Sequence, residues 1–386
     1  YVDSVYYPSE GISSRKPTKV SLFENFGTAM LHFRGMEIEF VGARKESYHR
    51  ESRKPVVESG TLEDDQRRRD FTINAMAFSL CEEDYGSLVD PFGGISDLAR
   101  GIIRTPLDPE VTFSDDPLRM FRAARFATKL STGEFRFTIV PECLSAMKNM
   151  ADRISILSKE RIVEELCKIL QGDTPSIGLS ILDETTLLEK VLPQVTNLKG
   201  VETVDGRGHK DNFSHTLQVV DHLAQSEKEA IAEGLLMDYT PSPDGAASES
   251  KVRTSPNVWL RWAGLLHDIT KQMPKDEQLK LIGDFITPLE KSNHKVWHQM
   301  SAPVFLKKNG IAMDEEILSA IRWHTTGKAD MTLLEKIVYT ADFISADRDY
   351  PDVDTVRRLA KISLEHAILY TSRYTIGDLI SHDRPV

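Results

Sequence analysis

The stretch AGLLHDITK, residues 263–271, places an adjacent histidine and aspartate, His267 and Asp268, in an otherwise apolar segment. A buried carboxylate beside an imidazole is costly, and it usually persists because it is paired or because it coordinates a metal ion. Residues that could complete such a site occur in four other segments, NFSHTLQVVDH, VWHQMSAP, IRWHTTGKAD and VYTADFISADRDYP, which contribute His215, His298, His324 and Asp342.

Imidazole and carboxylate ligands together favour Fe, Mn, Zn or Ni over a hard cation. Each of the six residues falls in a segment with helical character, so a helical bundle could direct all of them inward. A lone histidine on an apolar helix face is more often a core or surface residue than a ligand, and we interpret His222, His294 and His366 in this way. His294 and His298 share a helix face, which leaves open which of the two is the ligand.

Composition fits a protein of several globular domains. The chain has 386 residues, of which 40% are hydrophobic and 28% charged, and no run approaches the length of a membrane span. Its first residues lack a signal-peptide layout, and the scattered cysteines Cys81, Cys143 and Cys167 indicate a reducing cytoplasm without disulfides. The net charge of −11 argues against a broadly basic nucleic-acid surface but allows local basic stripes.

The periodicity changes along the chain. Strand-like alternation dominates to about residue 80, in KVSLFENFG, AMLHFRG, MEIEFVGAR and FTINAMAFSL, and helical periodicity follows from about residue 96. The segment DDPLRMFRAARFATKL directs Leu118, Phe121 and Phe126 toward a core. Residues 239–257, rich in Ser, Pro, Gly and Ala, are predicted to form a solvated loop.

Three segments of the first half could bind a nucleotide. In TLEDDQRRRDFTINAMAF, arginines beside Asp70 could hold a triphosphate close to a metal, although a solvated charge run is the alternative. In SDDPLRMFRAARF, Asp116 and Arg119 lie three apart on one helix face, continued by Arg122 and Arg125, and could read a base edge. An intrahelical salt bridge explains that spacing equally well.

In MEIEFVGAR, Glu37 and Glu39 lie on the same face of a strand. A carboxylate pair of this kind could bind Mg²⁺.

These segments, together with DPFGGISDLARGIIRT, SKERIVEEL and GVETVDGRGHKDNFSHT, closely resemble the class II tRNA nucleotidyltransferase (CCA-adding enzyme) and bacterial poly(A) polymerase family over about residues 20–270. The resemblance implies that Asp115, Asp116 and Arg119 form a template that selects CTP and then ATP, with Asp115 replacing the usual Glu. It implies Glu37 and Asp70 as catalytic residues acting with Mg²⁺, and nucleotide binding by Arg68, Arg69, Asp115, Asp116, Arg119 and Arg122.

The resemblance is incomplete at the N-terminus. The family carries a GGxVRD loop followed by a DxD pair that holds two Mg²⁺ ions, and neither motif occurs in the N-terminal part of this sequence. Two-metal phosphoryl transfer requires such carboxylates. We therefore expect that the chain is a fragment or that this half has lost its catalysis.

From about Leu265 the chain resembles the YqeK-type HD-domain hydrolases, which cleave dinucleoside tetraphosphates symmetrically. The resemblance, carried by LLHDITKQMPKDEQLKL and the segments around His298, His324 and Asp342, extends over about residues 213–386. It implies two transition-metal ions, Fe, Mn or another, bound by His215, His267, Asp268, His298, His324 and Asp342. It also implies a catalytic role for Asp268 and Lys271 and phosphate binding by Lys271, Thr325, Lys328 and Arg348. The spacing of 52 positions between His215 and His267 is long, and the loop at 239–257 accounts for the excess.

The predicted fold is an α/β head, a partial nucleotidyltransferase, followed by a predominantly α-helical neck, body and HD domain. The predicted boundaries are 1–85 for the head, 86–155 for the neck with its template helix, 156–212 for a helical RNA-binding body and 213–386 for the HD phosphohydrolase domain.

Two functions compete. In the first, the protein functions in the addition of CMP and AMP to RNA 3′ ends, with tRNA, CTP and ATP as partners. The HD domain is then an accessory phosphohydrolase. In the second, the HD domain hydrolyses a dinucleoside polyphosphate and the upstream half is a binding scaffold. An RNA-binding protein with a structural metal is disfavoured by the number of ligand positions. We expect HD hydrolysis but no CCA addition from this chain, no membrane association, and leave the oligomeric state open.

Overall fold

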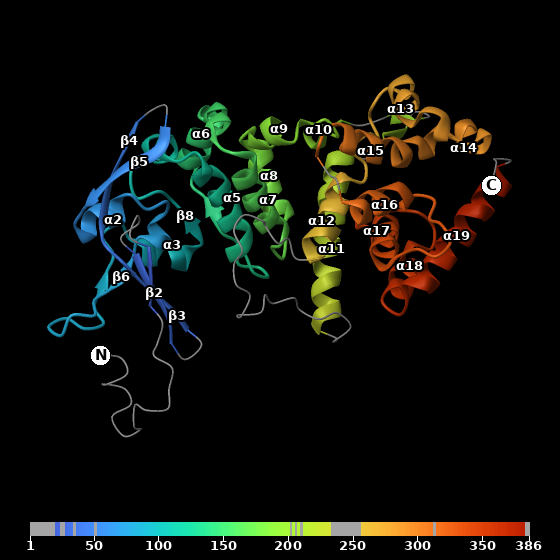
Figure 1. Ribbon diagram of the computed structural model, residues 1–386. Coiled ribbons are helices and arrows are strands. Elements are labelled where there is room, and N and C mark those ends of the chain that lie inside the picture. The colour runs from blue at the N-terminus through green and yellow to red at the C-terminus, as the bar shows by residue number, and fades with distance from the viewer. Residues whose placement is uncertain are drawn as a thin grey trace. The chain divides into compact units, whose positions relative to one another are not determined.

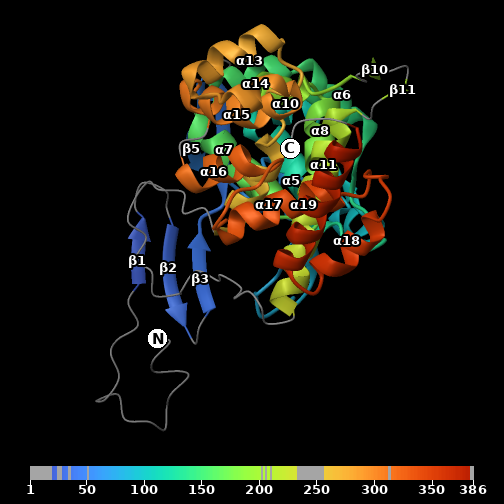
Figure 2. The same cartoon turned by 90° about the vertical axis from the view of Figure 1, so that its right-hand side faces the viewer.

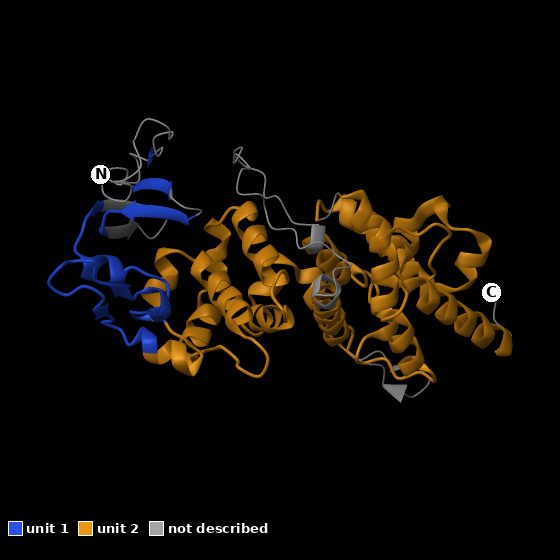
Figure 3. Cartoon of the chain, turned by 90° about the horizontal axis from the view of Figure 1, so that it is seen from below, with its two compact units in different colours: residues 1–95, 105–108 blue, residues 96–104, 109–386 orange. Residues whose placement is uncertain are grey.

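The computed structural model describes residues 20–23, 28–33, 36–49, 52–200, 203–204, 207–208, 211–232, 256–311 and 314–382. The chain divides into two compact units, one of residues 1–95 with 105–108 and one of residues 96–104 with 109–386 (Figure 3). Strands dominate the first unit and helices the second (Figure 1). The predicted fold class is therefore confirmed. The predicted boundaries within the helical part stay predictions, because the residues from 109 onward form one compact unit.

The first unit contains an antiparallel sheet of three strands in the order β1 (Val20–Phe23), β2 (Thr28–Phe33) and β3 (Met36–Val41), which lie side by side in Figure 2. Its register sets Ile38 opposite Leu31 and Glu37 opposite His32. Because side chains alternate along a strand, the apolar pair and the polar pair lie on opposite faces. Two further strands, β4 (Arg44–His49) and β5 (Ser52–Ser59), form a separate hairpin.

A short helix, α2 (Leu62–Arg67), leads into the 3₁₀ turn η3 (Thr72–Asn74) and the small hairpin of β6 (Ala77–Phe78) and β7 (Leu88–Val89). The prediction of one strand through FTINAMAFSL is therefore wrong for its first half. Asp70 Oδ1 accepts hydrogen bonds from the Phe71 N–H and from Asn74 Nδ2, at 2.9 and 3.0 Å. These local bonds close the backbone into a turn, and they outcompete strand pairing.

The helical unit begins with the residues predicted to form the neck and the body, and α5 is the central helix of this region. This helix packs on α7 and α8, and it buries Leu118 and Phe121 as predicted, while Phe126 is half-buried. A Cβ on Gly178 would lie 2.4 Å from Thr128 Oγ1, so α8 can approach α5 this closely only with glycine there. The elements of this region are α3 (Gly94–Arg100), β8 (Ile102–Ile103), α4 (Pro109–Asp115), α5 (Leu118–Leu130), β9 (Thr138–Ile139), α6 (Pro141–Asn149), η4 (Ala151–Ile156), α7 (Lys159–Leu170), α8 (Ser176–Glu184), α9 (Leu187–Val191) and α10 (Pro193–Thr196).

Four helices, α11 (Asn212–Ala232), α12 (Pro256–Leu266), α16 (Glu315–Trp323) and α17 (Leu333–Ile344), form the centre of the remaining part, with α12 packed against the other three. The predicted loop at 239–257 lies outside the described residues except for 256–257, where α12 begins. The other elements are β10 (Thr203–Val204), β11 (Arg207–Gly208), α13 (Lys275–Ile282), η5 (Gly283–Phe285), α14 (Pro288–Ser292), η6 (His294–Val296), α15 (Trp297–Lys308), α18 (Val353–Ala360) and α19 (Leu364–Ser381).

A buried arginine, Arg261, joins the end of α7 to α11 and α12. Arg261 on α12 donates from Nε and Nη2 to Glu227 on α11, at 3.1 and 2.9 Å, and both residues are at most 7% exposed. Its Nη1 also donates to the carbonyls of Leu170, the last residue of α7, and of Gly172, two residues further on. One guanidinium therefore satisfies a buried carboxylate and carbonyls at the end of a helix that have no partner within it.

We predict that Arg261→Met destabilises the helical unit by about 3–5 kcal/mol, because the substitution leaves the Glu227 carboxylate buried without its partner. Urea unfolding followed by circular dichroism measures the change. The matched control is Lys228→Met, since Lys228 forms a surface pair with Asp173 and should cost roughly 0–1 kcal/mol. Equal losses in the two variants would contradict the prediction.

Candidate metal centre and nucleotide-binding residues

The six predicted metal ligands converge in the interior of the helical unit, and each is at most 8% exposed. Three of them lie on helices, and this placement agrees with the helical prediction for His215 on α11, His298 on α15 and Asp342 on α17. The same prediction is wrong for the other three residues. His267 and Asp268 follow the last residue of α12, and His324 follows the last residue of α16.

The helix ends explain this placement. The final carbonyls of a helix have no partner within it. His267 Nδ1 donates to the Gly264 carbonyl at 2.7 Å, and His324 Nδ1 donates to the Ile321 carbonyl at 2.6 Å. Each bond spans three residues and satisfies one orphaned carbonyl. It also places the proton of the neutral ring on Nδ1, which leaves Nε2 as an electron-pair donor.

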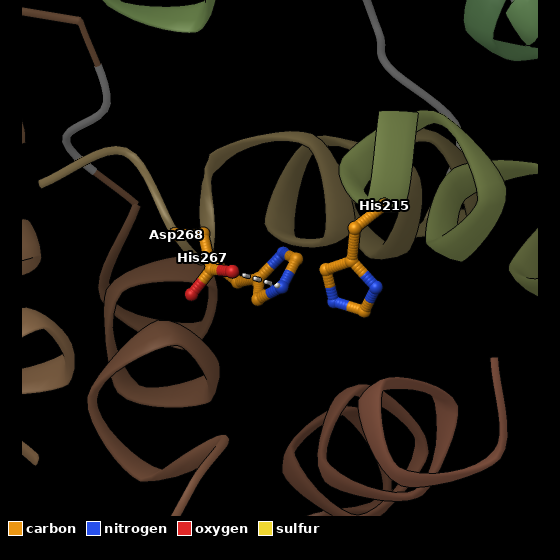
Figure 4. Close-up of side chains that lie close together, drawn as sticks. All are labelled: His215, His267 and Asp268. Carbon is orange, nitrogen blue, oxygen red and sulfur yellow. Dashed lines mark ion pairs between the residues drawn. The ribbon is translucent and has the colours of Figure 1, made fainter. Parts of the chain in front are cut away.

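The ligand atoms form two groups that share Asp268, one with His215 and His267 and the other with His298 and His324. Figure 4 shows the rings of His215 and His267 pointing toward each other beside the Asp268 carboxylate. Asp268 Oδ2 lies 3.4 Å from His267 Nε2, whereas Asp268 Oδ1 lies 3.4 Å from His298 Nε2 and 3.6 Å from His324 Nε2. The two oxygens of one carboxylate therefore face different groups.

The donor set fits metal ions. His267 Nε2 and Asp268 Oδ1 are buried, and neither has a hydrogen-bond partner in the described part of the chain. Buried polar atoms without partners are costly. His298 Nε2 lies 3.1 Å from His324 Nε2, and the second of these is the unprotonated nitrogen of its ring. Cations bound by these atoms would remove the cost, and the mixed imidazole and carboxylate donors suit a transition metal.

Two cationic side chains lie beside the carboxylates. Lys271 Nζ lies 2.6 Å from Asp268 Oδ2, while Arg348 donates to the Asp342 carboxylate and, from Nε at 2.8 Å, to the Asp342 carbonyl. Burial alone would raise the pKa of Asp268, but the neighbouring Lys271 and His267 hold this pKa well below its usual range. Arg348 does the same for the pKa of Asp342, again against burial.

His215 differs from the other predicted ligands because each of its two ring nitrogens lies close to a carboxylate. Its Nε2 faces Asp342 Oδ1 at 2.9 Å, and its Nδ1 lies 2.8 Å from Asp347 Oδ2. Burial would lower the pKa of His215, but hydrogen bonds to Asp342 and Asp347 raise it to about 9. His298 has the opposite balance, since burial lowers its pKa to about 3. Ser345 Oγ donates to Asp347 Oδ1 at 2.5 Å and fixes that carboxylate.

Two residues of the centre are not predicted by the sequence pattern. Asp347 lies five residues after Asp342 in the same segment, and Gln299 is fully buried next to His298 on α15. Gln299 Oε1 accepts the backbone N–H groups of Thr325 and Thr326, at 3.1 and 3.2 Å. This glutamine therefore holds the turn that follows His324.

The predicted phosphate-binding residues fall in two groups. Lys271, Arg348 and Thr325 lie at the cluster, with Thr325 Oγ1 3.3 Å from His298 Nε2. Lys328 instead pairs with the buried Glu335 at 2.7 Å. That salt bridge joins the turn after His324 to the first turn of α17, so the structure gives Lys328 a role in holding the loop.

The predicted nucleotide-binding residues of the first unit lie around α2 and β3. Arg68 and Arg69 both pair with the same carboxylate, that of Asp65. Glu37 is exposed on β3, with its carboxylate 3.9 Å from His32 Nδ1.

In the helical unit, Asp115 is the last residue of α4, and Asp116 lies between α4 and α5. The expectation that Asp116 and Arg119 share a helix face is therefore wrong, because α5 begins only at Leu118. Asp116 Oδ1 accepts the Leu118 N–H at 3.1 Å, and Asp116 Oδ2 accepts from Arg161 at 3.2 Å. Arg119 is 8% exposed and donates to the Thr112 carbonyl at 3.2 Å.

The other two arginines of α5 lie beside Phe126. The guanidinium carbon of Arg122 is 5.6 Å from the centroid of the Phe126 ring, and that of Arg125 is 4.3 Å from it. Arg125 also pairs with the buried Glu165 of α7 at 2.6 Å, so this arginine joins two helices.

Three family models match separate segments of the chain. Residues 9–104 match the poly(A) polymerase head domain, residues 136–199 a probable RNA- and SrmB-binding site of polymerase A, and residues 212–347 the HD domain.

The relatives in sequence are nucleotidyltransferases. The chain is 31% identical to the multifunctional CCA protein of Stenotrophomonas maltophilia over 79% of its own length and 72% of that protein. It is 42% identical to the nucleotidyltransferase lcsQ of Purpureocillium lilacinum over 42% of its length and 37% identical to the A-adding tRNA nucleotidyltransferase of Aquifex aeolicus over 47%. It spans only 26% and 21% of those two proteins, respectively.

The fold has a solved counterpart. A crystal structure of a tRNA nucleotidyltransferase complexed with a primer tRNA and an incoming ATP analogue aligns over 94% of this chain and 84% of that chain, with a TM-score of 0.51 at 20% identity. Together with the multifunctional CCA protein, this shared fold confirms the predicted resemblance. The chain belongs to the family of CCA-adding tRNA nucleotidyltransferases and carries an HD domain.

No helix in the described residues combines the length and the apolar character needed to cross a bilayer.

We predict that Asp347→Asn lowers the affinity of the centre for a divalent transition metal roughly 10- to 100-fold, because a carboxylate that accepts the second ring proton of a ligand orients the ring and increases its basicity. Competition with a chelator, read out by metal analysis, measures the affinity. Asp349→Asn, an exposed carboxylate two residues away, is the control. Unchanged affinity in Asp347→Asn would show that His215 needs no such partner.

Proposed function

We propose that this protein takes part in the addition of CMP and AMP to the 3′ ends of RNA, with tRNA as the substrate. We also propose that its HD domain is a metal-dependent phosphohydrolase. The proposal for RNA and nucleotide substrates rests on family membership and on the predicted template residues. The proposal for the HD domain rests on one observation above all, the buried histidine and aspartate cluster with donor atoms that lack protein partners. The scattered free cysteines fit a cytoplasmic setting.

The HD centre would bind two ions, one between His215, His267 and Asp268 and one between Asp268, His298 and His324, with Asp342 beside the first. Bound ions of this kind supply a water with a lowered pKa as nucleophile and polarise a phosphoryl oxygen. Lys271 and Arg348 would stabilise negative charge on the phosphate, because both lie at the carboxylates and both are partly exposed. The Thr325 hydroxyl, which lies 3.3 Å from His298 Nε2, would donate a hydrogen bond to a phosphate oxygen.

The test of the HD proposal is a pair of measurements on the same variant. Asp268→Asn should lose most of its bound metal and should lower hydrolysis of bis-p-nitrophenyl phosphate at least a hundredfold, since one carboxylate serves both groups. His294→Gln is the matched control, because His294 is exposed and lies only four residues from the ligand His298. Full hydrolysis by a metal-free Asp268→Asn protein would refute the proposal.

A dinucleoside tetraphosphate is the second candidate substrate of this centre. The favouring observation is the completeness of the HD donor set, which lies beside the cationic side chains of Lys271 and Arg348. Comparison of a dinucleoside tetraphosphate with bis-p-nitrophenyl phosphate decides between a specific and a general phosphohydrolase. Cleavage of the tetraphosphate into two diphosphates, at a much higher kcat/KM than the general probe, would support it.

Nucleotide selection is tested directly by equilibrium binding. We predict that the protein with Mg²⁺ binds CTP and ATP more tightly than UTP and GTP. Asp116→Ala should remove roughly 1–3 kcal/mol of that preference, the usual value of a hydrogen-bonded base contact. Isothermal titration calorimetry measures the four affinities, and Lys129→Gln, an exposed position on α5, serves as control. An unchanged preference in Asp116→Ala would exclude Asp116 from base recognition.

A further inference from the structure

The two arginines before Asp70 are held by one carboxylate. Asp65 on α2 is only 6% exposed, and each of its oxygens serves a different arginine. Oδ1 accepts from Arg68, from Nε at 3.0 Å and also from Nη2. Oδ2 accepts from Arg69, from Nε at 3.1 Å and from Nη2 at 2.8 Å. The carboxylate therefore forms a two-sided bridge between adjacent guanidinium groups.

Such a bridge has an electrostatic consequence. Two neighbouring guanidinium groups repel each other, and the repulsion is larger where water is partly excluded. A carboxylate between them offsets that repulsion and fixes both the distance and the planes of the two groups. Burial would raise the pKa of Asp65, but the hydrogen bonds and charges of Arg69 and Arg68 lower it. Asp65 therefore stays ionised at neutral pH.

Asp65 lies on a helix that hydrogen bonds hold in place. At the start of α2, Thr61 and Asp64 form a reciprocal capping box, with bonds of 2.9 Å from the Thr61 N–H and 3.2 Å from the Asp64 N–H. Next to Asp65, the buried Gln66 donates from Nε2 to the Ala75 carbonyl at 2.8 Å and to the Val89 carbonyl at 3.2 Å. The position of Asp65 is thus fixed to the turn and hairpin that follow.

The same helix supplies an internal contrast. Arg67 pairs with Glu63 at 2.7 Å, also between a carboxylate and an arginine four residues later. Both of these side chains are more than half exposed. An exposed pair of this kind contributes little, so only the Asp65 bridge combines burial with two partners.

We propose that Asp65 is a positioning residue that presents Arg68 and Arg69 as a fixed pair to the triphosphate of a bound nucleotide. The inference rests on the proposed nucleotide binding by these arginines. A guanidinium carries five N–H donors, so two bonds to Asp65 do not exhaust its capacity for phosphate oxygens. Because the pair is organised before the ligand arrives, less side-chain entropy is lost on binding.

Affinities for ATP and AMP test the proposal, because only the triphosphate reaches a phosphate clamp in full. Asp65→Asn should weaken ATP binding roughly 10- to 100-fold, the range expected when hydrogen bonds to charged groups are lost. Its AMP affinity should stay within about twofold of the unmodified protein, and Asp65→Glu should recover part of the ATP affinity. Glu63→Gln, the matched control, should change neither value. Calorimetry with Mg²⁺ gives all the constants, and circular dichroism establishes that each variant is folded.

A double variant separates positioning from general damage. If Asp65 acts through the arginines, Asp65→Asn should cost much less ATP affinity in an Arg69→Gln background than in the unmodified protein. Additive losses, an unchanged ATP affinity in Asp65→Asn, or an equal loss for AMP would each overturn the inference while leaving nucleotide binding intact. If the unmodified protein bound ATP no better than AMP, the proposed nucleotide site would fail as well.

Discussion

The arrangement of the second half of the molecule depends on two carboxylates buried in an apolar interior. Asp268 and Asp342 are 1% and 6% exposed, and an ionised carboxylate is tolerated at such depth only when it is paired or bound to metal. Lys271 and Arg348 provide part of the compensation, and the imidazoles of the cluster face the remaining oxygens. The four packed helices, their ends and the turns after them are arranged so that these groups meet.

A short turn at the end of the body forms hydrogen bonds to two segments next to the cluster. The Leu198 carbonyl accepts from the Phe213 N–H at 3.1 Å and from Gln272 Nε2 at 2.8 Å. Phe213 precedes His215 by two residues, and Gln272 follows the His267–Asp268 turn. The Gly200 N–H donates to Asp211 in addition, at 2.8 Å. The turn at the end of the body therefore contacts both segments that bring ligands to one half of the centre, which explains why the body and the HD helices form one compact unit.

The sequence predicts the fold class, and it predicts which histidines and aspartates converge in the interior, because a His-Asp pair in an apolar segment leaves few physical alternatives. It fails where tertiary context decides. The helical pattern around His267 and His324 continues past the true helix ends, and only the ring-to-carbonyl bonds show that the chain stops there. Asp347 lies in the polar segment ADRDYP, whose composition is that of a surface loop, and its contact with His215 joins residues 132 apart.

The role of Asp65 cannot be predicted from the sequence for a similar reason. In TLEDDQRRRD every acidic residue has an arginine within helical reach, so spacing alone cannot separate the exposed Glu63 pair from the buried Asp65 bridge. The difference is burial, which depends on how Gln66 ties the helix to the following hairpin. In both parts of the molecule a single buried carboxylate, Asp65 or Asp268, has each of its two oxygens facing a different partner. A carboxylate used in this way fixes the geometry of groups that would otherwise repel or separate. Such residues are therefore better recognised from what their two oxygens contact than from any motif.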